Sequence, residues 1–262
     1  MHQFAISTVI LCACSSVVIA QEDESVPHPE ALRRADVALP SLSQAINDAL
    51  ILGNGDLNGL LFAEGGDLIF RITKNDVWDA RLDAELNPPI PTLERLKELG
   101  NGEWPDRNWI LPEGYEYHKN DAYHAHPYPC PRACGVLRIP GAAAALQSAA
   151  LSLRYAEASV FTTDGTSRLL VPAEENVIVV RTGDASKSML EPVISEDIPM
   201  AETGEVDGVT WIRQEIPGDL DWPGMSFAVA LAVRDGVAAA AVATSLESEE
   251  PLSMAIDLAR KA

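Results

Sequence analysis

The stretch LILGNGDLNGLLFAEGGDLIFRITKNDVWDAR, residues 50–81, holds the strongest structural pattern in the chain. Two apolar runs, 57–63 and 68–73, are separated by Gly65-Gly66. Glycine adopts positive φ at no steric cost, so this dipeptide is typical of a tight turn. Side chains in the second run alternate in the manner of a strand. The stretch therefore predicts a β-hairpin, followed by a polar loop at 74–79 that carries Trp78.

Two ligand-binding motifs overlap this stretch, and both are incomplete. A dinucleotide fingerprint needs three glycines that open a helix, but Asn58 stands where the third should be, and a strand pattern follows. An EF-hand calcium loop needs a closing Glu, and Gly65 occupies that position. The pattern favours neither site, and we predict no cofactor.

Composition and charge limit the class of partner. The chain has 262 residues, 47% of them hydrophobic, which is enough to form one large β domain or two small ones. Its formal net charge is −20 at pH 7. So acidic a surface repels phosphate backbones, and we expect no nucleic-acid partner.

The N-terminus has the pattern of a signal peptide. An apolar run at 4–11 is followed by Val18-Ile19-Ala20, whose last residue suits a cleavage site before Gln21. We expect cleavage after Ala20 and export. Lipoprotein processing at Cys14 and a membrane anchor are the alternatives, and the anchor ranks last because the run is short for a span. No later run is long enough to cross a bilayer.

Cys130 and Cys134 remain after removal of the signal peptide. In an oxidising compartment they are close enough in sequence to form a disulfide, or they stay as thiols. Three histidines lie just upstream, which raises the question of zinc, but the spacing matches no standard zinc framework. We therefore predict the disulfide and no metal; the histidines are His118, His124 and His126.

Alternating apolar runs and turn dipeptides continue through the chain, and they predict a mainly β fold, a large antiparallel β-sandwich of the supersandwich kind. The expected later strands are 135–139, 151–161, 168–171, 177–181, 209–216, 226–233 and 237–244, with a hairpin turn at 163–166. Helical spacing appears at 93–99 and 252–262. The remaining stretches read as connections: an aromatic-rich loop at 101–131, an alanine-rich connector at 141–150 and an acidic loop at 184–208.

Three segments together carry a family resemblance. GNGDLNGLLF, GDLIFRITKNDVWD and the meander LSLRYAEASVFTTDGTSRLLVPAEENVIVVRTG resemble the N-terminal β-sandwich domain of glycoside hydrolase family 95, the α-L-fucosidase type. They resemble still more closely the uncharacterised family-95-like N-terminal domains of secreted bacterial proteins. The resemblance implies a signal peptide at 1–20, a polar leader at 21–40, a sandwich at 41–248 and, at 249–262, the start of a linker helix towards a catalytic barrel.

The resemblance also implies a function. Family 95 keeps its catalytic acid and base in the (α/α)6 barrel, so we assign no catalytic residue here and expect no glycosidic bond to be hydrolysed. Asn75, Asp76 and Trp78 match the family segment that reaches the sugar, so carbohydrate and a downstream barrel are the expected partners. An equally open interpretation has Trp78 anchoring the hairpin and Asn75-Asp76 forming a turn. The alternative function is a stand-alone exported carbohydrate-binding or structural β domain.

Overall fold

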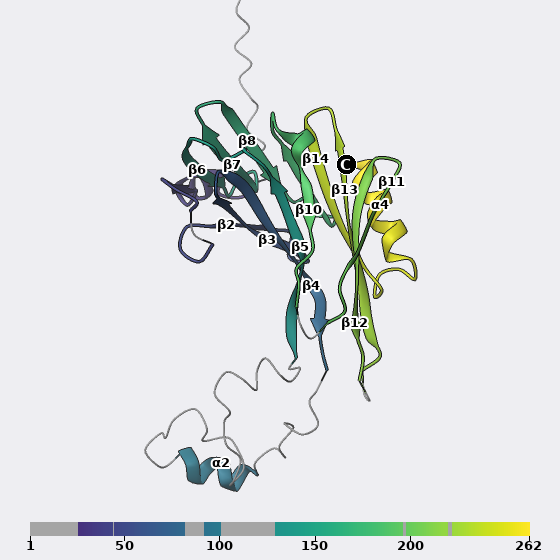
Figure 1. Cartoon of the computed structure of the whole chain (residues 1–262). Helices are drawn as coiled ribbons and strands as arrows, with labels where there is room; N and C mark the ends of the chain where they lie inside the picture. The colour runs from purple at the N-terminus through teal and green to yellow at the C-terminus, as the bar shows by residue number, and fades with distance from the viewer. Residues whose placement is uncertain (1–25, 44, 82–91, 101–128, 196–197, 220–221) are drawn as a thin grey trace, which may run out of the picture.

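The computed structural model describes residues 26–43, 45–81, 92–100, 129–195, 198–219 and 222–262. Two antiparallel sheets lie face to face (Figure 1). The first, sheet A, has the order β1-β6-β7-β8-β9-β14-β13-β12-β11, and the second, sheet B, has the order β10-β5-β4-β3-β2. The predicted antiparallel β-sandwich is thereby confirmed.

The strands of sheet A are β1 (Val37–Leu39), β6 (Leu146–Ser152), β7 (Glu157–Thr162), β8 (Gly165–Leu170), β9 (Val177–Arg181), β11 (Glu202–Val206), β12 (Val209–Pro217), β13 (Gly224–Arg234) and β14 (Val237–Thr244). Those of sheet B are β2 (Leu50–Gly53), β3 (Leu57–Glu64), β4 (Asp67–Asp79), β5 (Cys130–Ile139) and β10 (Met189–Glu191). The helical elements are α1 (Pro29–Arg34), α2 (Leu93–Gly100), η1 (Ala185–Lys187) and α4 (Pro251–Lys261).

The main core lies between the two sheets. Alternate residues of each strand point inward, such as Leu68, Phe70 and Ile72 on β4, and all three are almost fully buried. Gly59 on β3 faces Ile72, and a Cβ at this glycine would come within 2.2 Å of the Phe70 ring and 2.5 Å of the Arg71 carbonyl oxygen. The missing side chain at Gly59 therefore makes room for the largest core residue of the predicted hairpin.

A second apolar cluster lies on the outer face of sheet A, under α4 (Figure 1). The helix buries Ala255, Ile256 and Ala259 against the alanine-rich strands β13 and β14. Small side chains on both surfaces let the helix backbone approach the sheet closely. The helix predicted at 252–262 is confirmed, and it packs against the sandwich itself.

The hairpin and most of the strands are where the sequence pattern places them. The turn glycines Gly65 and Gly66 have φ of 60° and 91°, as the hairpin requires. Strands β9 and β14 match their predicted bounds, and β3, β8, β12 and β13 differ by a few residues at their ends. The helix predicted at 93–99 is α2.

Four local predictions were wrong. The predicted loop at 74–79 is the second half of β4, because Asp79 and Trp78 pair with β5. The run 151–161 is two strands: β6 begins inside the predicted alanine-rich connector, and a turn with Ala156 at φ 49° leads into β7. The acidic loop at 184–208 contains η1, β10 and β11. Residues 21–40, for which the sequence predicts only a polar leader, contain α1 and β1. Short edge strands such as β10 take their conformation from the neighbour with which they pair, and a local pattern does not reveal that neighbour.

Within the described ranges, no helix has the length and apolar character needed to cross a bilayer. The predicted signal peptide at 1–20 and most of the aromatic loop at 101–131 lie outside the described residues.

Candidate functional site

An irregular stretch of β4 organises the candidate site. Thr73 pairs with Ala133 and Trp78 with Pro131, so five residue steps on β4 oppose two on β5. Residues 74–77 therefore bulge out of the ladder with β5, while Lys74 still pairs with Leu57 on β3. A β-bulge of this kind redirects side chains away from strict alternation, and bulges are frequent next to functional sites.

Lys74 lies at the centre of a buried ionic cluster. Its Nζ is 2.9 Å from Asp56 Oδ2, 2.9 Å from Asp76 Oδ1 and 3.1 Å from Glu247 Oε1, and the residue is only 2% exposed. Burial by itself would lower the pKa of the Lys74 ammonium, but the three carboxylates outweigh it and raise that pKa above its usual value. Lys74 is therefore a permanently charged cation at neutral pH.

The carboxylates of this cluster are also held by neutral side chains. Asn176 Nδ2 donates to Asp56 Oδ2 at 2.8 Å and to Glu247 Oε1 at 3.0 Å, and Thr244 Oγ1 donates to Asp76 Oδ2 at 2.7 Å. Burial would raise the pKa of the Asp56 carboxyl, yet its hydrogen bonds from Lys74 and Asn176 lower that pKa below the ordinary value. All three acids thus have a cationic or hydrogen-bonding partner, as buried charge requires.

The Lys74 cluster, defined here as these six side chains, joins the two sheets at one end of the sandwich. Asp56 comes from the β2–β3 turn, and Lys74 and Asp76 come from β4, so three members belong to sheet B. The other three belong to sheet A: Asn176 precedes β9, Thr244 ends β14 and Glu247 follows it. A polar network of this kind fixes the relative position of the loops from which its members come.

Asn54 fastens the Gly-Asn-Gly-Asp turn to the opposite sheet. Its Oδ1 accepts hydrogen bonds from the backbone N–H groups of Asp56 at 3.0 Å and Leu57 at 2.8 Å. Its Nδ2 donates to the carbonyl oxygens of Pro172 at 3.0 Å and Glu175 at 3.1 Å. Sequence reasoning recognised this residue only as part of a turn. Its reach across the sandwich depends on a loop more than a hundred positions away, which no local pattern indicates.

Of the three residues predicted to contact a sugar, the structure brings two together at the surface. The Trp78 side chain is 43% exposed, and its Nε1–H donates to the carbonyl oxygen of Asn75 at 2.7 Å. Asn75 is exposed as well; its side chain accepts from Asn58 Nδ2 at 3.0 Å and donates to the Gly55 carbonyl oxygen. The interpretation in which Trp78 anchors the hairpin in the core is therefore wrong.

Asp76, the third predicted residue, has a different orientation. Its carboxylate is directed towards Lys74 and Thr244 inside the sandwich. Regular alternation already puts Asp76 on the same side of β4 as Lys74 and opposite Asn75. The irregular stretch shifts the alternation only after Asp76, so that Val77 is buried and Trp78 is exposed. Asp76 belongs to the Lys74 cluster, and the exposed surface at this end of β4 is made by Asn75 and Trp78.

A second buried ion pair lies at the end of β4. Asp79 is fully buried; Arg81 donates to its two oxygens from Nε at 2.9 Å and Nη2 at 2.8 Å, and Arg132 Nη2 donates to Oδ2 at 2.6 Å. Burial would raise the pKa of the Asp79 carboxyl, but the two guanidinium groups lower it below its usual value. This pair of arginines holds the ends of β4 and β5 together. Sequence reasoning missed it, since Arg132 comes from a different strand.

The predicted disulfide is not formed. Cys130 and Cys134 are not bonded to each other, and both lie on the same strand, β5. Four residues of extended strand separate two α-carbons by about 13 Å, whereas a disulfide needs less than about 7 Å. Cys134 is buried in the main core, and burial raises the pKa of its thiol to about 12.

No metal site is found within the described residues, where no three His, Cys, Asp or Glu side chains are arranged to hold an ion. The histidines weighed above, at 118, 124 and 126, fall outside those residues.

No protein-family model matches this chain, and no curated protein matches it.

Proposed function

We propose that this chain is the non-catalytic N-terminal sandwich domain of an exported, family-95-like glycoside hydrolase, and that it contacts carbohydrate through Asn75 and Trp78. The observation that supports this most directly is the exposed indole of Trp78 on a rigid base. Its sequence context, the Gly-Asn-Gly-Asp turn and the Lys-Asn-Asp-Val-Trp segment, is the one on which the family resemblance depends.

The chemistry of the two side chains suits a sugar. An aromatic face packs well against an apolar surface while its polar edge keeps a hydrogen bond, and here the indole N–H is already satisfied by Asn75. The indole face is therefore left for the C–H surface of a sugar ring. The Asn75 amide lies beside it and can exchange hydrogen bonds with ring hydroxyls.

The Lys74 cluster gives this surface its rigidity. Asn75 and Asp76 directly follow Lys74, which is held by three carboxylates, and the Asn75 backbone N–H donates to the Asp56 carbonyl oxygen at 2.9 Å. A contact surface whose side chains are positioned in advance loses less entropy on binding. In this proposal Asp76 is a positioning residue. The sequence predicts that Asp76 contacts the sugar directly, and the proposal gives that contact to Asn75 and Trp78 alone.

The proposal leaves hydrolysis to another domain. A glycosidase needs a carboxylic acid with a raised pKa and a second carboxylate placed to act on the same bond. The buried or half-buried acids of this site have the opposite property, since the pKa values of both Asp56 and Asp79 are lowered by cations. We therefore retain the expectation that the chain itself cleaves no glycosidic bond.

One observation favours the alternative, a stand-alone exported carbohydrate-binding or structural β domain. Helix α4 covers the part of the outer face of sheet A formed by β12, β13 and β14, and it shares the apolar cluster there. It is thus a structural part of the sandwich. The sugar contact through Asn75 and Trp78 is common to both functions.

The test is a titration of the purified chain lacking residues 1–20 with mono- and oligosaccharides, including α-L-fucosides and α-L-galactosides, followed by calorimetry and Trp fluorescence. We expect weak saturable binding that is lost in Trp78→Ala and partly kept in Trp78→Phe, because the phenyl ring still stacks. Tyr155→Ala is the matched control, since Tyr155 is an exposed aromatic residue, 70% accessible, in the turn between β6 and β7 of sheet A.

Two outcomes would refute the proposal. One is sugar binding that Trp78→Ala leaves unchanged, which would place the contact elsewhere. The other is turnover of aryl-glycosides by the pure chain above the blank, which would require an acid and base within the sandwich.

A further inference from the structure

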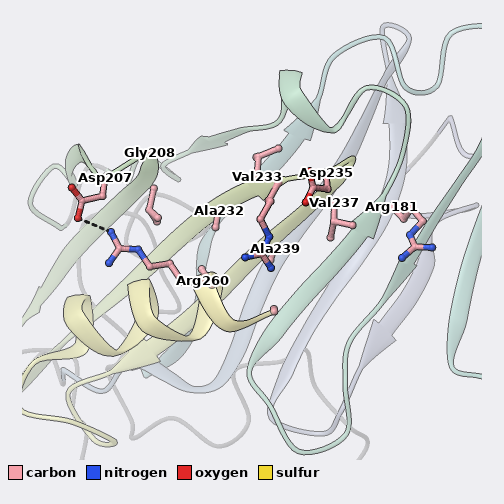
Figure 2. Close-up of a pocket in the computed structure, with 13 residues that line it drawn as sticks. Arg181, Asp207, Gly208, Ala232, Val233, Asp235, Val237, Ala239 and Arg260 are labelled. Atoms are coloured by element: carbon pink, nitrogen blue, oxygen red, sulfur yellow. Dashed lines mark hydrogen bonds and ion pairs between the residues drawn. The ribbon is translucent and has the colours of Figure 1, made fainter.

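A second surface of the molecule, on the outer face of sheet A, has the features of a ligand site. A cavity of about 400 Å³ lies beside the C-terminal end of α4, over strands β9, β14 and β13 (Figure 2). Its floor is apolar, made by Ala232, Val237, Ala239 and Ala259. Figure 2 shows Arg181 and Arg260 on opposite sides of this floor.

Strand register places arginines in a row across the floor. Arg181 on β9 pairs with Val237 on β14, which pairs in turn with Arg234 on β13. Directly opposed residues of adjacent strands point to the same face, so both arginine side chains leave the sheet on its outer face, on either side of Val237. The two backbones are two strand spacings apart, about 10 Å, which long arginine side chains can bridge around one small ligand.

The row extends further, to β8, where Arg168 directly opposes Arg181. Like charges in directly opposed positions destabilise a sheet. Arg168 forms an ion pair with Glu157, whose Oε1 is 3.5 Å from Arg168 Nη1. The chain contains 39 acidic and only 19 basic side chains, so a run of opposed arginines is contrary to its overall composition.

The arginines around the cavity differ in whether they already have a partner within the fold. Arg260 Nη2 donates to Asp207 Oδ2 at 3.0 Å, so its charge is neutralised within the fold. Arg181 and Arg234 are exposed, and within the described part of the chain their side chains have neither an ion pair nor a hydrogen bond. Two guanidinium groups with unused donors thus flank one apolar floor.

We propose that this cavity binds a sugar acid, through a carboxylate held between Arg181 and Arg234. Guanidinium groups recognise carboxylates by paired, charge-assisted hydrogen bonds. The apolar floor at Val237 and Ala239 accommodates the C–H face of a ring. Asp235, which also lines the cavity and is exposed, is an acceptor for hydroxyl donors, so the site matches a ligand that carries both a carboxylate and hydroxyl groups.

This site is independent of Asn75 and Trp78, which belong to sheet B. Calorimetry or ligand-observed NMR with galacturonic acid as the probe tests it on the same protein, with galactose and inorganic sulfate as comparisons. We expect saturable binding of galacturonic acid that weakens with added salt, weaker binding of sulfate and none of galactose at this site. The affinity should fall about tenfold in Arg181→Gln and in Arg234→Gln, as loss of a charged hydrogen-bond donor predicts.

Matched variants make the test specific. Arg71→Gln removes an exposed arginine from sheet B, with the same change in net charge, and should leave the affinity unchanged. Val237→Glu should abolish binding, because its carboxylate would occupy the space between the two arginines, while thermal stability is kept or raised. Trp78→Ala should bind galacturonic acid normally, which separates this inference from the proposed function.

Three results would overturn the proposal: no saturable binding of galacturonic acid at millimolar concentrations, equal loss of affinity in Arg71→Gln, or equal affinity for sulfate and galacturonic acid. The last would show that the apolar floor contributes nothing to recognition.

Discussion

Cys134 shows how much one residue's chemistry depends on its place in the fold. In sequence it is one of two nearby cysteines in a chain that we expect to be exported, and this predicts a disulfide. In the structure the Cys134 side chain lies in the core between the sheets, where burial favours the uncharged thiol over the charged thiolate. Because the thiolate is the reactive form, burial and the raised pKa both suppress its chemistry.

We therefore predict that Cys134 resists alkylation at pH 8 in the folded protein and reacts fully only after unfolding. Mass spectrometry after a timed reaction with iodoacetamide, in buffer and in denaturant, measures this directly. Cys130 is the internal comparison, since it is only half-buried. Recovery of a Cys130–Cys134 disulfide from non-reduced native protein would contradict both the prediction and the strand assignment of β5.

At the scale of elements, the bulge in β4 is the feature that builds the site. Lys74 and Asp76 keep the inward side and Asn75 the outward side, as in a regular strand, but the bulge shifts the alternation so that Val77 is buried and Trp78 is exposed. The carboxylates around Lys74 come from the β2–β3 turn, β4 and the segment after β14. Lys74 thus links the β2–β3 turn and β4, which are neighbours in sequence, to the segment after β14, which is distant from both.

Lys74→Met should lower the free energy of unfolding by about 3–5 kcal/mol, because it leaves three partly buried carboxylates without their cation. Urea denaturation followed by circular dichroism measures the loss. Arg71→Met is the control on the same strand, since Arg71 is exposed, and it should change stability by less than about 0.5 kcal/mol. A stability for Lys74→Met within error of the parent protein would mean that the cluster contributes no net energy.

At the scale of the whole molecule, the buried ion pairs set the pH range of stability. The pKa values of Asp56 and Asp79 are lower in the folded state than the ordinary value, so unfolding takes up protons in acid. Their stabilisation is complete above about pH 4 and is lost as the pH falls through the folded-state values. The pKa of Lys74 is raised, so its contribution is complete below about pH 10.4 and is lost at higher pH.

We therefore expect a broad maximum of stability between about pH 5 and 9, with a decline on both sides. Urea midpoints measured at half-unit pH intervals, at constant ionic strength, would trace this curve. A stability that increases steadily down to pH 3 would show that relief of the excess negative charge outweighs the buried pairs.

The sequence by itself determined the class of fold. Alternation and turn glycines are local properties, and they were sufficient for the central hairpin, for β9 and β14, and for the C-terminal helix. The tertiary structure alone decided what lies at the site. The sequence singled out residues 74–79 but assigned them to a loop, whereas pairing with β5 makes them a bulged strand. The shift in alternation at that bulge puts Trp78, in place of Val77, on the exposed side with Asn75. The Lys74 cluster and the arginine row both arise from contacts between strands far apart in the chain, and such contacts are set by sheet order and register, which no local pattern encodes.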